Sequence, residues 1–196
     1  LLSAAAVMGL SFDALLLVDV GAADASSFLD LLDEAVAAGV VVERVEGLQI
    51  AHEFVHALTR DALYEEMSAL RRARMHQQIA IALERRDAPA EVLAHHFRAA
   101  AAVGEAARAV QYTLAAADAA LATFANEQAL DGYRQAAALL GALPASTPEQ
   151  RIDVDTRIGE CLRRLGHPDY LPVLFAAAAA ASELADGPRM AAALLA

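Results

Sequence analysis

The chain has 196 residues, a formal net charge of −11 and 15 basic residues, all of them arginine. Without a lysine it carries no phosphate-binding loop of the G-x-x-x-x-G-K-[ST] type, because that loop needs a lysine to reach the phosphates. The acidic balance also argues against nucleic acid as a direct partner, since affinity for DNA or RNA depends on neutralised phosphates.

The composition favours a helical protein outside the membrane. Ala, Leu and Val dominate a hydrophobic fraction of 58%, which is typical of closely packed helices. The richest apolar run, Leu171 to Ala181, is too short to cross a bilayer, so no membrane partner is expected. The single Cys161 fits a reducing compartment and favours a cytoplasmic location. Both ends of the chain lie inside apolar helical patterns, so we expect a fragment of a longer protein.

Residues 1–53 are expected to form three short helices followed by a β-hairpin. Leu1 to Met8 is the first helix, and Ser11 is a candidate N-cap for the second. The two β-rich runs VVVERV and LQIAHEF then meet across Glu46-Gly47, which is typical of a hairpin turn. Three helices and a hairpin in this order predict a winged-helix domain.

Winged helices often bind DNA through their third helix, but the third helix here carries only acidic charges, on Asp30, Asp33 and Glu34. Residues 1–53 hold nine acidic residues against the single Arg44. Because this charge would repel phosphates, we expect no direct nucleic-acid contact.

A domain boundary is expected in the polar, proline-bearing segment 84–90, which follows two helices separated near Ser68. We place a winged-helix-like regulatory domain with its connecting helices at 1–86. Truncated tetratricopeptide-like helical repeats follow at 87–196. The predicted fold class is therefore mainly α, a winged-helix domain followed by an α-helical repeat array.

Only helices are expected from Ala90 onward. Asn126 is a candidate N-cap for the helix EQALDGYRQAAALL. The run Thr147-Pro148-Glu149-Gln150 combines a capping residue, a proline at the first helical position and a capping-box glutamine. We therefore expect a well-defined helix start at this point.

A weak internal repeat links two of these helices. Three residues of one helix match three residues that lie 41 positions further along the chain: Ala129, Tyr133 and Ala136 match Tyr170, Leu174 and Ala177. Small residues at fixed places with a large one between them are typical of tetratricopeptide repeats, whose period is about 34 residues. A generic α-solenoid or a plain helical bundle fits the same pattern.

His52-Glu53-Phe54-Val55-His56 is a literal H-E-x-x-H motif. On a helix, His52 and His56 would share one face and could bind one zinc ion, with Glu53 as general base on the metal-bound water. This motif defines the alternative of a zinc metallopeptidase.

Three features weigh against that alternative. LQIAHEF alternates like the returning strand of a hairpin, so a change from strand to helix near Val55 would separate the two imidazoles. No histidine follows at the HxxGxxH spacing, and Glu84 lies in the polar segment without a supporting motif. An Ala-rich helical array also offers no evident open cleft of the kind that catalytic zinc needs.

A recurring pattern runs through three segments: Phe54-x-His56-Ala57-Leu58-x-Arg60-Asp61-Ala62-Leu63-Tyr64-Glu65, Arg72-x-Arg74-x-His76-x-x-Ile79-Ala80-x-x-Leu83 and Ala94-His95-His96. It resembles the region after the nucleotide-binding domain in bacterial STAND-type signalling ATPases, the large LuxR-type transcriptional regulators and their adenylate-cyclase-linked relatives. LLSAAAVMGLSFD, LLDEAVAAGVV and ALATFANEQALDGYRQAAALL are also similar to that family.

The resemblance implies an upstream P-loop domain in cis that binds ATP or ADP, and a winged-helix domain that folds over the nucleotide. The helical repeats would sense a protein or small-molecule ligand. The effector, a DNA-binding or cyclase domain, would lie elsewhere in a parent protein that forms a homo-oligomer when activated. The fragment would then have no catalytic residue and no cofactor of its own.

In STAND proteins a winged-helix histidine can contact the nucleotide β-phosphate and hold the ADP-bound state. The resemblance carries this role onto His56, with Arg60 as a second candidate phosphate contact. His56 is expected where a strand meets a helix N-terminus, a place that favours anions. Two alternatives stay open beside the peptidase: His56 is bonded within its own domain, and the chain is a stand-alone helical-repeat scaffold.

Overall fold

The computed structural model describes residues 1–21, 25–46 and 49–196. Helices dominate it, so the predicted mainly-α class is confirmed. None of the helices in these ranges is long and apolar enough to cross a membrane. The chain divides into two compact units, of which the first contains Leu1–Ala88 and Ala99–Gly104 and the second contains Pro89–Arg98 and Glu105–Ala196.

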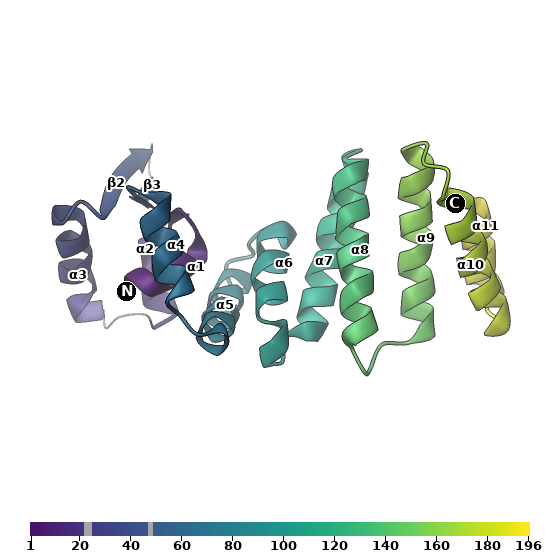
Figure 1. Cartoon of the computed structure of the whole chain (residues 1–196), viewed down its shortest axis with the longest axis horizontal. Coiled ribbons are helices and arrows are strands. Elements are labelled where there is room, and N and C mark those ends of the chain that lie inside the picture. Colours follow the sequence, from purple (N-terminus) through teal and green to yellow (C-terminus); the bar gives the residue numbers. More distant parts are fainter. Residues whose placement is uncertain (22–24, 47–48) are drawn as a thin grey trace. The chain divides into compact units, whose positions relative to one another are not determined.

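The first unit combines short helices with a small sheet (Figure 1). Its elements are α1 (Leu2–Met8), β1 (Ser11–Phe12), α2 (Ala14–Asp19), α3 (Ala25–Ala37), β2 (Val41–Glu46), β3 (Gln49–Phe54), α4 (Ala57–Glu65), α5 (Ala69–Glu84) and the 3-10 turn η1 (Ala101–Val103). Strands β2 and β3 are antiparallel neighbours, with Glu43 opposite His52. β1 pairs with the other edge of β3, which gives the strand order β1-β3-β2. The predicted turn residue Gly47 lies outside the described residues.

The prediction that Ser11 caps the second helix is wrong. Ser11 and Phe12 form β1 and pair with Glu53 and His52. This pairing holds the backbone at Ser11 extended, so α2 begins only at Ala14. Its cap is Asp13, whose carboxylate accepts a hydrogen bond from the Leu15 amide at 2.8 Å.

The core of the first unit lies between the sheet and the helices. Phe12 and Phe54 come from adjacent strands, and their ring centroids are 5.5 Å apart. Phe28 and Leu32 of α3 are buried in the same cluster, together with Leu17 of α2. Each such side chain stabilises the fold by about 1.5–3 kcal/mol when buried.

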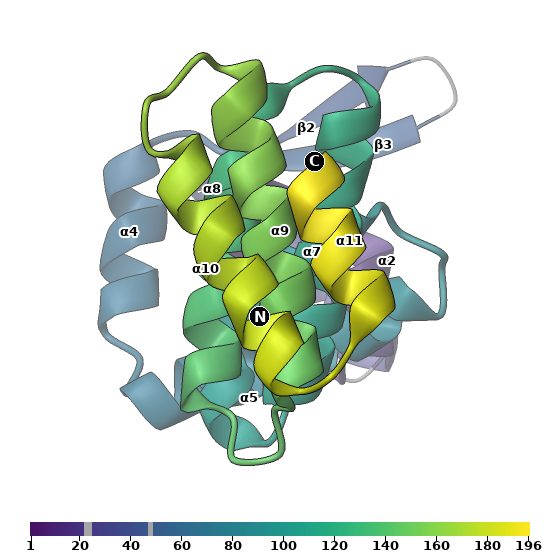
Figure 2. The ribbon, with the colours of Figure 1, turned by 90° about the vertical axis from the view of Figure 1, so that its right-hand side faces the viewer.

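The second unit is built from helices alone in the described residues (Figures 1 and 2). Its helices are α6 (Ala90–Ala99), α7 (Ala106–Ala122), α8 (Asn126–Ala142), α9 (Pro148–Arg164), α10 (Tyr170–Glu183) and α11 (Gly187–Leu195). From α7 onward each helix packs against the next one in the chain.

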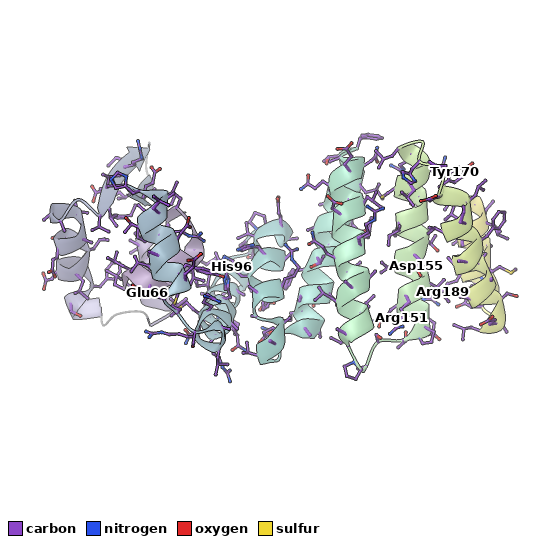
Figure 3. The ribbon with its side chains drawn as sticks, in the orientation of Figure 1. Glu66, His96, Arg151, Asp155, Tyr170 and Arg189 are labelled. Carbon is purple, nitrogen blue, oxygen red and sulfur yellow. The ribbon has the colours of Figure 1, made fainter. Side chains whose placement is uncertain are left out.

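Small residues let these neighbouring helices approach closely. A Cβ added at Gly132 of α8 would lie 2.8 Å from the Cβ of Ala117 in α7, and one added at Gly159 of α9 would lie 2.4 Å from Leu174 of α10. Polar contacts also cross the array. Arg189 of α11 (labelled in Figure 3) donates to both carboxylate oxygens of Asp153 in α9, at 2.7 and 3.0 Å.

Of the two helix caps predicted in the second unit, one is confirmed and the other is wrong. The capping box at Thr147 is confirmed, with reciprocal bonds of 3.3 and 3.0 Å between Thr147 and Gln150. The prediction for Asn126 is wrong, because the cap is Ala125 and Asn126 is the first helical residue. Phe124 has a positive φ of 62°, and this tight turn brings α8 to its start one residue earlier than expected.

Candidate functional site

His56 lies at the junction between β3 and α4. Phe54 is the last residue of the strand, Ala57 is the first of the helix, and His56 is the extended N-cap between them, with φ −128° and ψ 125°. No side chain caps this helix start, and the His56 side chain is exposed. An uncapped helix N-terminus presents partial positive charge, which favours an anion at this position.

Arg60, the second candidate phosphate contact, is the fourth residue of α4. Its Nε donates to the backbone oxygen of Ala6 in α1 at 2.9 Å, and its Nη1 donates to Asp61 at 2.8 Å. The guanidinium is therefore already held by groups of its own unit, and its visible role is to join α4 to α1.

A polar cluster that the sequence analysis did not assemble surrounds Tyr64 of α4. The guanidinium carbons of Arg60 and Arg72 lie 5.1 and 5.2 Å from the centre of the Tyr64 ring. The Tyr64 hydroxyl is 3.2 Å from Nε2 of the buried His76 in α5. Arg72 also donates to the backbone oxygen of Met67 at 3.0 Å. The contacts of Tyr64 with His76 and Arg72 hold the C-terminal end of α4 against α5.

The H-E-x-x-H residues do not have the arrangement of a zinc peptidase. His52 is on a strand, its ring is buried and stacked on Phe12, and its Nε2 is 3.6 Å from Glu43 on the neighbouring strand. Glu53, the proposed general base, forms an ion pair with Arg44 at 2.5 Å. Because the chain changes from strand to helix between His52 and His56, the two imidazoles do not share a helix face. This geometry does not support a zinc site on His52 and His56.

Comparison of the chain with protein-family models, with curated proteins and with solved structures finds no match.

Proposed function

We propose that the chain is the regulatory part of a STAND-type signalling ATPase, made of a winged-helix domain and tetratricopeptide-like repeats. The observation that carries this proposal is the element order of the first unit: helix, strand, helix, helix and hairpin, with the first strand paired to the last. This is the order expected of a winged helix, in which the short first strand completes the sheet of the hairpin.

The helices of the second unit support the repeat part of the proposal. The matched triplets lie on α8 and α10. Tyr133 is buried between two buried alanines, and the matching Leu174 is buried between the half-buried Tyr170 and the buried Ala177. Gly132 and Gly159 supply the close helix contacts that such pairs need. Helix pairs stacked in this way form extended surfaces that suit a protein or small-molecule ligand.

In this proposal the chain couples nucleotide state to ligand sensing and does no chemistry itself. ATP or ADP is bound by a P-loop domain in the parent protein, and the output is transcriptional or cyclic-nucleotide signalling in the cytoplasm. A first test is the encoding reading frame. A P-loop upstream of residue 1 supports the proposal, whereas a frame without one leaves a helical-repeat scaffold.

The proposal assigns His56 to the β-phosphate of ADP, because its exposed imidazole lies at the uncapped start of α4. In the full-length protein, His56→Ala should weaken ADP binding by about tenfold or more, the expected loss for a hydrogen bond to a charged group. Basal signalling should rise, since the ADP-bound state is the resting one. Fluorescence anisotropy with a labelled ADP measures the affinity.

His167→Ala is the matched control, because His167 is a half-exposed histidine of the second unit, 3.7 Å from Asp169. It should leave ADP affinity unchanged. If His56→Ala also leaves ADP affinity and basal signalling unchanged, the role of His56 is wrong.

A further inference from the structure

A pocket of about 440 Å³ opens between α6, α7 and α8 of the second unit. This volume is in the usual range for small-ligand sites, about 300–1,000 Å³. Its charged and polar lining comes from all three helices: Glu91 and Arg98 on α6, Thr113 on α7, and Glu127, Gln128, Asp131 and Gln135 on α8. The described residues that line the pocket therefore all belong to the second unit.

Arg98 supplies the positive charge of the pocket lining. In the part of the chain that the structure describes, no carboxylate lies within ion-pair distance of its guanidinium. Arg98 is half-buried, and burial lowers its pKa, because the charged form loses hydration without gaining an ionic partner. Such a guanidinium favours a bound anion, and its planar fork matches a carboxylate.

Thr113 supplies a second polar group without a partner. Its side chain is 1% exposed, and its hydroxyl makes no hydrogen bond to any described residue. A buried hydroxyl in this state is unfavourable, so it gains from a ligand that accepts its proton. Thr113 and Arg98 line the same pocket.

The acidic residues of the lining favour bound cations. Glu91, Glu127 and Asp131 are exposed, and none of them forms an ion pair with a described residue. Three carboxylates and one guanidinium give the lining two excess negative charges. A ligand that satisfies the whole pocket therefore has one carboxylate and a surplus of cationic groups.

We propose that this pocket binds a free basic amino acid. Its α-carboxylate accepts from Arg98 and Thr113, and its α-ammonium and side-chain cation face Glu91, Glu127 and Asp131. A diamine would leave Arg98 without an anion, and an acidic amino acid would be repelled by the three carboxylates. The binding of this amino acid is argued from the pocket alone. Its role as the ligand that the helical repeats sense rests on the proposed function.

Calorimetric titration of the 196-residue chain with L-lysine tests the proposal. L-lysine should bind saturably, and cadaverine, which has the same side chain without the carboxylate, should bind at least about tenfold more weakly. L-glutamate should not bind. Nα-acetyl-L-lysine imitates the C-terminus of a peptide and should also bind more weakly than L-lysine, because it lacks the α-ammonium group.

Variants assign the contacts. Arg98→Gln should weaken L-lysine binding at least about tenfold. Arg134→Gln removes the same charge from an exposed position of α8 outside the pocket and should leave binding unchanged. Thr113→Val should weaken binding severalfold without lowering the melting temperature, because the hydroxyl it removes has no partner in the protein.

Four results would overturn the proposal: no saturable binding of L-lysine, binding of cadaverine as tight as that of L-lysine, binding of Nα-acetyl-L-lysine tighter than that of L-lysine, or an affinity of Arg98→Gln for L-lysine equal to that of the wild type. These outcomes are distinct from failure of the proposed function, which is read from ADP affinity in the full-length protein. Binding of L-lysine without any nucleotide coupling would support the pocket and contradict the signalling role.

Discussion

Tyr133 of α8 is the largest fully buried side chain, and it shows how one residue is fitted to its helix pair. Its ring is in the core shared with α7 and α9, and its hydroxyl donates to Asp118 of α7 at 2.5 Å. Burial first, and then the hydrogen bond to Asp118, raise the pKa of Tyr133 well above its ordinary value. The folded state therefore holds the neutral phenol more firmly than the unfolded state does.

This difference predicts a loss of stability at alkaline pH. A tyrosine in the unfolded chain ionises near pH 10, whereas Tyr133 in the folded chain keeps its proton to higher pH. The stabilisation is complete below about pH 10 and is lost as pH rises toward the folded pKa. The unfolding free energy of the wild type should thus fall more steeply above pH 10 than that of Tyr133→Phe. Urea melts across this range measure both slopes, and parallel curves would contradict the prediction.

Single residues also explain why the predicted N-caps of two helices are wrong. Ser11 and Asn126 are both good capping residues by type, but a cap needs the correct backbone position as well. Strand pairing with β3 fixes Ser11, and the turn at Phe124 fixes Asn126. The capping box at Thr147 was predicted correctly because both halves of the box lie within four residues, so no distant contact is needed.

At the scale of the element, how closely two helices approach depends on where a glycine, which has no side chain, faces the neighbouring helix. Gly132 and Gly141 are both in α8, but only Gly132 faces another helix closely. The faces of amphipathic elements follow the same logic. Phe28 and Leu32 of α3 are buried, whereas Leu31, which helical periodicity places on the same face, is 42% exposed. Periodicity gives the general direction of a face, and packing decides how wide it is.

Gly132→Ala and Gly141→Ala form a matched pair on one helix. The new Cβ at position 132 would lie 2.8 Å from the Ala117 Cβ, so overpacking of about 1–3 kcal/mol should exceed the helix-propensity gain. At position 141 the new Cβ would have no described atom within 4 Å beyond the nearby backbone of its own helix, so alanine should stabilise by up to about 1 kcal/mol. Chemical denaturation measures both changes. Equal effects of the two substitutions would show that α7 and α8 are not in close contact.

At the scale of the whole molecule, the acidic balance sets which partners are acceptable. The net charge is −11, and the three acids of α3 are all exposed. Long-range repulsion of this kind acts on any phosphate backbone, whatever the details of the surface. The proposed winged-helix domain is accordingly assigned to contacts within its own protein.

The chain should therefore not bind duplex DNA, even at low salt. Reversing the charge of α3 with Asp30→Lys, Asp33→Lys and Glu34→Lys should create weak binding that falls as salt increases, since each new contact releases counterions. Fluorescence anisotropy with a labelled duplex compares the two proteins. Salt-dependent binding by the wild type would show that another surface contacts the DNA.

The sequence alone determined the helical class, the hairpin and the helix start at Thr147, because these features depend on composition, periodicity and neighbours along the chain. It also placed His56 at a change from strand to helix, since alternation stops at Phe54.

Only the tertiary structure decided that β1 exists, that Arg60 is held by Ala6, and that Arg98 and Thr113 line one pocket without partners. Each of these facts joins residues that are distant in the chain or on different helices. Local pattern has no access to such contacts, because a side chain's partner is set by the packing of whole elements.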